Sequence, residues 1–115
     1  MNELNVKAAI VILNWNDEET SATALKSLRQ AELCGAQIIL VDNGSEDGSD
    51  KKLKVRFPEI NIIRLPQNLG YAGGCNAGIQ RAMETGCDAI FIMNDDVIVS
   101  KNFLEPLLMK YLYSL

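Results

Sequence analysis

The sequence predicts a three-layer α/β fold with a mostly parallel sheet. Short apolar runs alternate with helical patterns along the chain, and these runs are rich in the β-branched residues of strands buried on both faces. No internal repeat, low-complexity tract or linker-like stretch divides the chain. We therefore expect its 115 residues to form one domain, 1–115, in which right-handed crossovers join the parallel strands.

Four apolar runs are the expected strands, and a helical pattern follows each of them. Glu18 and Glu19 stand where the positive end of a helix dipole favours acids, Pro58 ends the second helical pattern, and Gly86 suits the end of the third. The expected strands cover residues 7–13, 37–41, 61–65 and 88–93, and the expected helices cover 18–31, 47 or 49 to 57, 75–84 and 101–112.

The composition excludes several classes of function. A net charge of -4 lacks the basic footprint that binds nucleic-acid phosphates, so we expect no nucleic-acid partner. The absence of histidine excludes a His-based triad, a His-rich zinc site and a His general base. Asp, Glu and Lys therefore remain for any acid–base chemistry.

The sequence also predicts the location of the protein. Its N-terminal residues are polar, and the longest apolar stretch, 8–13, is far shorter than the roughly 20 residues that cross a bilayer. Cys34, Cys75 and Cys87 form no Cys-x-x-Cys pair, and we interpret them as reduced thiols. We expect a cytoplasmic protein.

Three of the four expected strands end in clusters of short polar residues, at 14–17, 42–45 and 94–96. Ligands of open parallel sheets bind outside the carboxyl ends of the strands. Each cluster alone is also typical of ordinary loops and helix caps. Because all three are expected at one edge of the sheet, together they favour a ligand site.

The segment Asn94-Asp95-Asp96 predicts a cation site at this edge. Two adjacent carboxylates repel each other, and a hard divalent cation such as Mg²⁺ or Mn²⁺ removes this repulsion while it bridges a diphosphate. The alternative is that both carboxylates face water and one of them caps the next turn.

A glycine-rich segment, 68–78, precedes the third expected helix. Its glycines permit close approach of the backbone to a phosphate or a sugar, although a plain turn that packs a helix is the alternative. The spacing is that of neither a dinucleotide-binding fingerprint nor a P-loop. Trp15, just after the first strand, is suited either to stacking on a base or to half-buried packing.

The chain resembles the family-2 inverting glycosyltransferases with the GT-A fold, in particular the rhamnosyltransferase-like members. Four motifs in the order of the family carry the resemblance: Val11-Ile-Leu-Asn-Trp-Asn16, Ile39-Leu-Val-Asp-Asn-Gly-Ser45, Asn68-Leu-Gly-Tyr-Ala-Gly-Gly-Cys-Asn76 and Phe91-Ile-Met-Asn-Asp-Asp-Val97. The resemblance implies the Rossmann-like, nucleotide-sugar-binding half of a GT-A fold. It also implies a dTDP- or UDP-sugar donor and an Mg²⁺ or Mn²⁺ cofactor.

The resemblance assigns binding roles to residues in each motif. Asn14 and Trp15 are implied to flank the nucleobase, and Asn16 is implied to bind the substrate. Asp42 is implied to bond the base, with Asn43 and Ser45 nearby. The residues implied to lie against the ribose and the diphosphate are Asn68, Gly74 and Asn76. Asn94 and Asp96 match the ends of the family's Asp-x-Asp motif, so that Asp96 is the implied metal ligand, with Asp95 either helping or facing solvent.

Inverting transfer needs a carboxylate base, which in this family lies downstream of the Asp-x-Asp strand. We find no persuasive base after Asp96, since Glu105 falls within the last expected helix. We therefore expect a truncated, donor-binding portion that is incomplete for catalysis alone. The resemblance implies a carbohydrate or lipid-linked acceptor for the complete enzyme, a role in cell-wall or polysaccharide biosynthesis, and a location in the cytoplasm or at the inner face of the membrane.

Two other readings of the sequence stay open. The chain could be a non-catalytic interaction or oligomerisation module, a homo-oligomer included, that uses a sheet edge or the apolar face of its last helix. It could also be another phospho-ligand protein. A nucleotidyltransferase would want a basic, glycine-rich loop after the first strand, and a receiver domain would want a lysine better placed than Lys101.

Overall fold

The computed structural model describes residues 5–113 and contains one parallel sheet in that part of the chain. The strands are β1 (Ala8–Asn14), β2 (Gln37–Asp42), β3 (Asn61–Arg64) and β4 (Ala89–Met93), in the order β3-β2-β1-β4. In this order β1 lies between β2 and β4. All the neighbouring pairs are parallel, so all four carboxyl ends point the same way.

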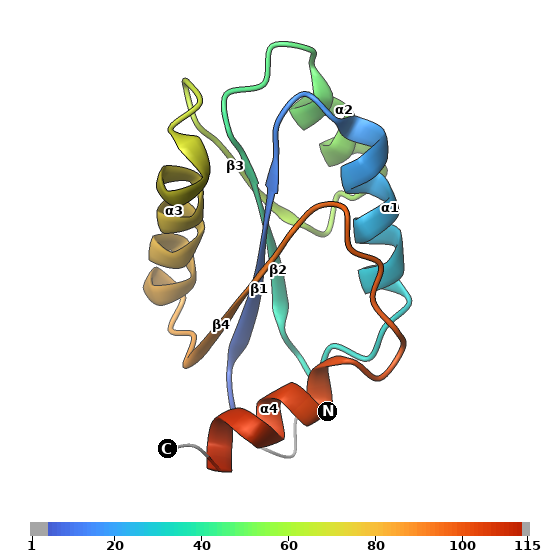
Figure 1. Cartoon of the computed structure of the whole chain (residues 1–115), viewed down its shortest axis with the longest axis vertical. Coiled ribbons are helices and arrows are strands. Elements are labelled where there is room, and N and C mark those ends of the chain that lie inside the picture. Colours follow the sequence, from blue (N-terminus) through green and yellow to red (C-terminus); the bar gives the residue numbers. More distant parts are fainter. Residues whose placement is uncertain (1–4, 114–115) are drawn as a thin grey trace.

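The helices form the two outer layers. They are α1 (Glu18–Arg29), α2 (Ser49–Arg56), α3 (Gly70–Glu84) and α4 (Leu104–Tyr113). α1 and α2 cover one face of the sheet and α3 covers the other, while α4 lies across the end of the sheet opposite the carboxyl ends of the strands (Figure 1). The predicted three-layer α/β class is therefore confirmed. The described strands are entirely parallel rather than mostly so.

Alternate residues of the strands pack into two apolar cores. On one face, Ile10, Ile12 and Leu40 pack with side chains of α1, α2 and α4. On the other face, Val11 and Val41 belong to the smaller core beneath α3. Successive side chains of a strand point to opposite faces, so a run that is buried on both sides must be apolar throughout, as the sequence indicated.

The predicted elements exist, but several of their bounds differ. β1 and β2 each continue one residue further, through Asn14 and Asp42, because these polar side chains find buried partners. α1 ends at Arg29, and α4 begins at Leu104 rather than at residue 101. The largest difference is in α3, which begins at Gly70 instead of residue 75, because hydrogen bonds to the preceding turn allow the glycine-rich segment to be helical.

The last helix, α4, packs against the larger core. Leu104 and Leu108 of α4 are completely buried in the larger core, so much of the apolar face of this helix is covered by the chain itself.

Cys34, Cys75 and Cys87 are free thiols. Among residues 5–113, no helix combines the length and the apolar character that a bilayer span requires.

α3 packs unusually close to the sheet at Gly78. A Cβ atom at this position would overlap the side chain of Val11 and would lie 3.1 Å from Cγ2 of Val41. For Gly78→Ala we expect the free energy of unfolding to fall by about 1–2 kcal/mol, because so close an overlap costs about 2–3 kcal/mol, the upper part of the usual range for overpacking, and the gain in helix propensity is only roughly 1 kcal/mol. Urea denaturation measures the change.

The matched control is Gln80→Ala, on the exposed side of the same helix. Its free energy of unfolding should stay within about 0.5 kcal/mol of the parent chain. A Gly78→Ala chain as stable as the parent would contradict the close packing.

Candidate functional site

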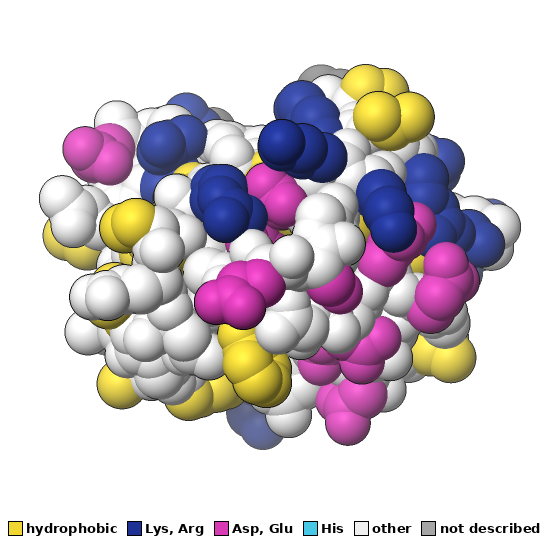
Figure 2. All heavy atoms as spheres, turned by 90° about the horizontal axis from the view of Figure 1, so that it is seen from above, with side chains coloured by type: hydrophobic (Ala, Val, Ile, Leu, Met, Phe, Trp, Pro, Cys, Tyr) yellow, Lys and Arg dark blue, Asp and Glu magenta, His cyan; other side chains and the backbone are white. Residues whose placement is uncertain are grey.

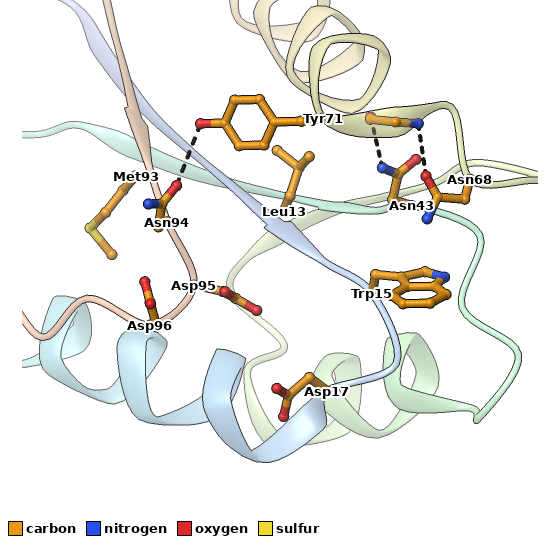
Figure 3. Close-up of a pocket in the computed structure, with 11 residues that line it drawn as sticks. Leu13, Trp15, Asp17, Asn43, Asn68, Tyr71, Met93, Asn94, Asp95 and Asp96 are labelled. Carbon is orange, nitrogen blue, oxygen red and sulfur yellow. Dashed lines mark hydrogen bonds between the residues drawn. The ribbon is translucent and has the colours of Figure 1, made fainter.

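A hollow of about 470 Å³ lies at the carboxyl end of the sheet, between the first turn of α3 and the segment that follows β4. The loops that follow the four strands contribute to it, together with the ends of β1 and β4 and the start of α3. Its lining consists of Leu13, Trp15, Asp17, Asn43, Asn68, Gly70, Tyr71, Met93, Asn94, Asp95 and Asp96 (Figure 3). Seen from above, this end of the molecule carries acidic side chains from its centre toward the lower right of the view, and most Lys and Arg side chains lie across its upper half (Figure 2).

Strand alternation decides which polar residues reach the hollow. Leu13 and Asn43 continue the rows of Val11 and Val41 on the α3 face, and both line the hollow. Asn14 and Asp42 continue the opposite rows and are completely buried on the side of α1 and α2. Adjacent residues of one motif therefore have different surroundings.

Behind the hollow, Asn14 is the centre of a buried hydrogen-bond network. Its amide Nδ2 donates to Asp42 Oδ1 at 2.9 Å and to Ser49 Oγ at 2.8 Å, with a longer contact of 3.3 Å to Ser45 Oγ. Ser21 Oγ donates to Asn14 Oδ1 at 2.7 Å. Asn14 thus ties the end of β1 to α1, β2 and α2.

Asp42 has all its acceptor positions engaged within the protein. Oδ1 accepts from Asn14 and from Ser45 Oγ, at 2.9 and 2.6 Å, and Oδ2 accepts from Ser45 N and Arg64, both at 3.1 Å. Arg64 also pairs with Asp50 at 3.3 Å. A direct bond from Asp42 to a nucleobase would require one of these bonds to open, and that contact stays a prediction.

The turn before α3 is held by two asparagine side chains of the lining. Asn43 accepts from Leu69 N at 2.9 Å and donates to the Gly70 carbonyl at 3.0 Å, and Asn68 accepts from Gly70 N at 2.7 Å. Gly70 adopts a positive φ of 77°, which favours glycine. A Cβ on Gly74 would lie only 2.6 Å from Leu13 Cδ2, so the first turns of α3 lie directly against the floor of the hollow.

Three carboxylates form the acid end of the hollow: Asp17, Asp95 and Asp96. Asp17 also caps α1, where it accepts from Thr20 N at 3.2 Å. Burial raises the pKa of Asp95, and the negative charges of Asp17 and Asp96 raise it further. Within residues 5–113, no three His, Cys, Asp or Glu side chains form a ready-made metal cluster.

The structure brings together about half of the residues predicted from the sequence. Those that line the hollow are Trp15, Asn43, Asn68, Asn94, Asp95 and Asp96. Asn14, Asp42 and Ser45 are buried behind it, and Gly74 lies beneath it. Asn16 and Asn76 are exposed outside the lining, and Asn16 accepts from Glu46 N at 2.8 Å. The binding roles assigned to all twelve stay predictions.

Five lining residues were not named as site residues from the sequence: Leu13, Asp17, Gly70, Tyr71 and Met93. Leu13 and Met93 are the last apolar residues of their strands, a position that could have marked them. Asp17 was part of the polar cluster 14–17 but was not assigned a site role, although it both caps α1 and faces the hollow. Tyr71 carried no separate signal, because the expected helix began after it.

Comparisons with known proteins point to one family. The family model described as "Glycosyl transferase family 2" matches residues 9–113. The chain is 32% identical over 104 residues to the uncharacterized glycosyltransferase YfnE of Bacillus subtilis, a match that covers 86% of this chain and 25% of YfnE. It is also 32% identical over 78 residues to the N-acetylglucosaminyl-diphospho-decaprenol L-rhamnosyltransferase of Mycobacterium tuberculosis, covering 68% of this chain and 25% of that protein. The match therefore spans about a quarter of the length of both relatives.

Solved structures share the fold. TarS of S. aureus superposes with a TM-score of 0.73 at 15% identity, over 90% of this chain and 19% of TarS. The mannosyltransferase PcManGT of Pyrobaculum calidifontis, solved in complex with GDP-Man and Mn²⁺, superposes with a TM-score of 0.62 at 14% identity, over 77% of this chain and 27% of that one. At such low identity these similarities concern the fold.

The Asn14 network leads to a prediction about stability. Asn14→Ala removes a hydrogen-bond partner of three buried side chains, Ser21, Asp42 and Ser49. The polar atoms that lose this bond are buried, so water cannot replace it. We expect the free energy of unfolding to fall by more than about 2 kcal/mol. Asn68→Ala, which removes an exposed capping bond, is the control and should cost less than about 1 kcal/mol. Equal losses in urea denaturation would argue against a structural role for Asn14.

The raised pKa of Asp95 leads to a prediction about pH. A carboxyl group whose pKa is higher in the folded state than in the unfolded state makes folding less favourable once both states are ionised. We expect Asp95→Asn to be more stable than the parent chain at pH 7. The difference should shrink as the pH falls through the raised pKa of the folded state and vanish well below about 4, where the parent carboxyl is protonated in both states.

Asp47→Asn is a control of opposite sign. Hydrogen bonds from Ser49 lower the pKa of Asp47, so its ionised form contributes stability that is lost as the pH falls. The Asp47→Asn chain should therefore be the less stable one at pH 7. Thermal or urea unfolding between pH 3 and 7 checks both signs, and a constant Asp95→Asn difference over this range would contradict the crowding of carboxylates.

Proposed function

Because this chain belongs to glycosyl transferase family 2 and has the GT-A type of fold, we propose that its hollow binds a nucleoside-diphosphate sugar through a divalent cation, Mg²⁺ or Mn²⁺, for inverting sugar transfer. One observation carries the proposal. The described lining contains three carboxylates and neither lysine nor arginine. No lysine or arginine side chain of the lining could therefore neutralise the negative charge of a bound diphosphate.

The charges explain why the cation is central to the proposal. Two like charges 4 Å apart repel by about 4 kcal/mol at the effective dielectric constant of a protein surface. The raised pKa of Asp95 reflects its burial first and then repulsion of this kind from Asp17 and Asp96. A divalent cation held by one or two carboxylates, with diphosphate oxygens and water as its other ligands, suits this set of donors. The lack of a three-residue metal cluster among residues 5–113 fits an ion that arrives with its substrate.

We place the parts of the donor by the chemistry of the lining. Trp15 is 55% exposed and stands near Asn43 and Asn68, where an aromatic face and amide groups suit a nucleobase and a ribose. The diphosphate then lies between the acid end and the start of α3. That helix has no acid in its first turn, so its N–H groups favour an anion.

In this arrangement Asp96 is the main ligand of the cation, with Asp95 beside it. Charge that develops on the leaving diphosphate oxygen would be neutralised by the cation when it is bound. Asn43 and Asn68 keep the turn before α3 in place, so the donor meets a site that is already organised. Asn14, Asp42 and Ser45 support the site from behind.

The transfer itself belongs to a larger assembly in this proposal. The matched relatives are about four times as long as the part that this chain matches, and we assign the general base and the acceptor site to the rest of such an enzyme. The acceptor is a carbohydrate or a lipid-linked sugar, as in cell-wall or polysaccharide synthesis. The reaction then takes place in the cytoplasm or at the inner face of the membrane.

A second candidate is a non-catalytic module that binds a partner or a second copy. β4 forms one edge of the described sheet, and Ile92 in this strand is 44% exposed. Ile98, which lies beside Thr20 and Thr23 of α1, is 70% exposed. A dimer in solution that binds no nucleotide would favour this candidate over donor binding.

Calorimetric titration with UDP, dTDP and GDP, each with and without Mn²⁺, tests the main proposal. We expect at least one of the three to bind with Mn²⁺ and to bind at least tenfold more weakly without it. Asp96→Ala should reduce binding in Mn²⁺ to the metal-free level while it changes stability little, because Asp96 is exposed. Glu105→Ala, which removes an exposed acid of α4, is the matched control and should bind as the parent does. No Mn²⁺-dependent binding of any of the three nucleotides would overturn the proposal.

A further inference from the structure

The Tyr71 side chain connects two sides of the hollow. Tyr71 is the second residue of α3 and is 62% exposed, and its hydroxyl donates to Asn94 Oδ1 at 3.4 Å (Figure 3). Asn94 is the first residue after β4. Within residues 5–113, this is the side-chain hydrogen bond that joins α3 to the segment carrying Asp95 and Asp96.

The backbone around Tyr71 is held in place on its N-terminal side. Asn43 bonds both Leu69 N and the Gly70 carbonyl, and Asn68 bonds Gly70 N. The tight packing of Gly74 on Leu13 prevents this end of α3 from moving toward the sheet. The backbone that carries Tyr71 is therefore held in place by the protein before any ligand arrives.

The Asn94 side chain, in contrast, is exposed and has two ends of opposite chemistry. Its Oδ1 can accept a hydrogen bond or coordinate a cation, and its Nδ2 can only donate. In the part of the chain that the structure describes, Nδ2 makes no hydrogen bond. The bond from Tyr71 to Oδ1 thus distinguishes the two ends of an amide that would otherwise rotate freely.

We propose that Tyr71 is a positioning residue for Asn94: its hydroxyl keeps Oδ1 turned toward α3, so that Asn94 meets the donor through its NH₂ group rather than as a metal ligand. The group that Asn94 bonds is then an oxygen of the diphosphate or a hydroxyl of the sugar. Asp95 and Asp96 remain the carboxylates available to the cation. This inference rests on the proposed donor site.

The first test uses the free protein and needs no ligand. The side-chain amide signal of Asn94, identified in a ¹H–¹⁵N NMR spectrum by its loss in Asn94→Ala, reports the surroundings of that group. Tyr71→Phe keeps the ring and removes only the hydroxyl, and we expect the Asn94 signal to shift and the two hydrogens to become more alike. Tyr111→Phe removes a hydroxyl that bonds the Asp88 carbonyl at 2.8 Å, at the opposite end of the sheet, and should leave the signal unchanged. An unshifted Asn94 signal in Tyr71→Phe would overturn the proposal.

The second test is a double-mutant cycle for binding. The titrations of UDP, dTDP and GDP in Mn²⁺ are repeated with Tyr71→Phe, Asn94→Ala and the double variant. Loss of one hydrogen bond predicts that Tyr71→Phe weakens binding about threefold to tenfold. In the Asn94→Ala background the same change should have less than about a twofold effect, because Tyr71 then has no side chain to position. An undiminished effect in that background would show that the hydroxyl acts on the ligand directly, which would overturn the positioning role.

The two tests separate the inference from the function on which it rests. If the parent chain binds none of the three nucleotides in Mn²⁺, the proposed function fails, and the NMR signal of Asn94 still decides whether Tyr71 positions it. If the parent binds and Tyr71→Phe binds equally well, donor binding stands and the positioning role fails.

Discussion

The buried amide of Asn14 is the interaction on which the rest of the site depends. It lies at the end of the central strand, completely inaccessible to water, and its hydrogen bonds reach Ser21 in α1, Asp42 in β2 and Ser49 in α2. A buried polar group without a partner costs more than its bond contributes, so these elements cannot shift independently. The loops that continue from β1 and β2 toward the hollow therefore start from fixed points.

This arrangement separates support from binding. The side chains of the network have their hydrogen-bonding capacity engaged within the protein, and no described buried side-chain polar atom lacks a partner. The lining instead presents carboxylates, amides and two exposed aromatic rings, with Asn43 buried and Asp95 half-buried. On the other face of the sheet, close packing at Gly74 and Gly78 sets the distance between α3 and β1. The hollow is thus bounded by a hydrogen-bonded network behind it and by a tightly packed helix beside it.

The electrostatics of the hollow work against the stability of the free protein. Asp17, Asp95 and Asp96 lie at one end, and burial together with their mutual repulsion raises the pKa of Asp95. A cluster of like charges with no neighbouring Lys or Arg in the lining is unfavourable until a cation binds. In the proposed function, relief of this repulsion by the cation favours binding of a metal-bound diphosphate. In the same proposal, the start of α3, which carries no acid in its first turn, is the complementary surface for the anion.

The sequence by itself determined the fold class, the order of the elements, the family and the edge of the sheet where the polar clusters meet. It could do so because strands buried on both faces must be continuously apolar, and because parallel crossovers bring all carboxyl ends to one edge. Only the tertiary structure decided which residue of each cluster faces the hollow. Asp42 and Asn43 are neighbours in the chain, but strand alternation turns Asp42 into the network and Asn43 toward the hollow. It likewise decided that α3 begins at Gly70 and that Tyr71 meets Asn94, because both depend on hydrogen bonds between segments that are far apart in the sequence.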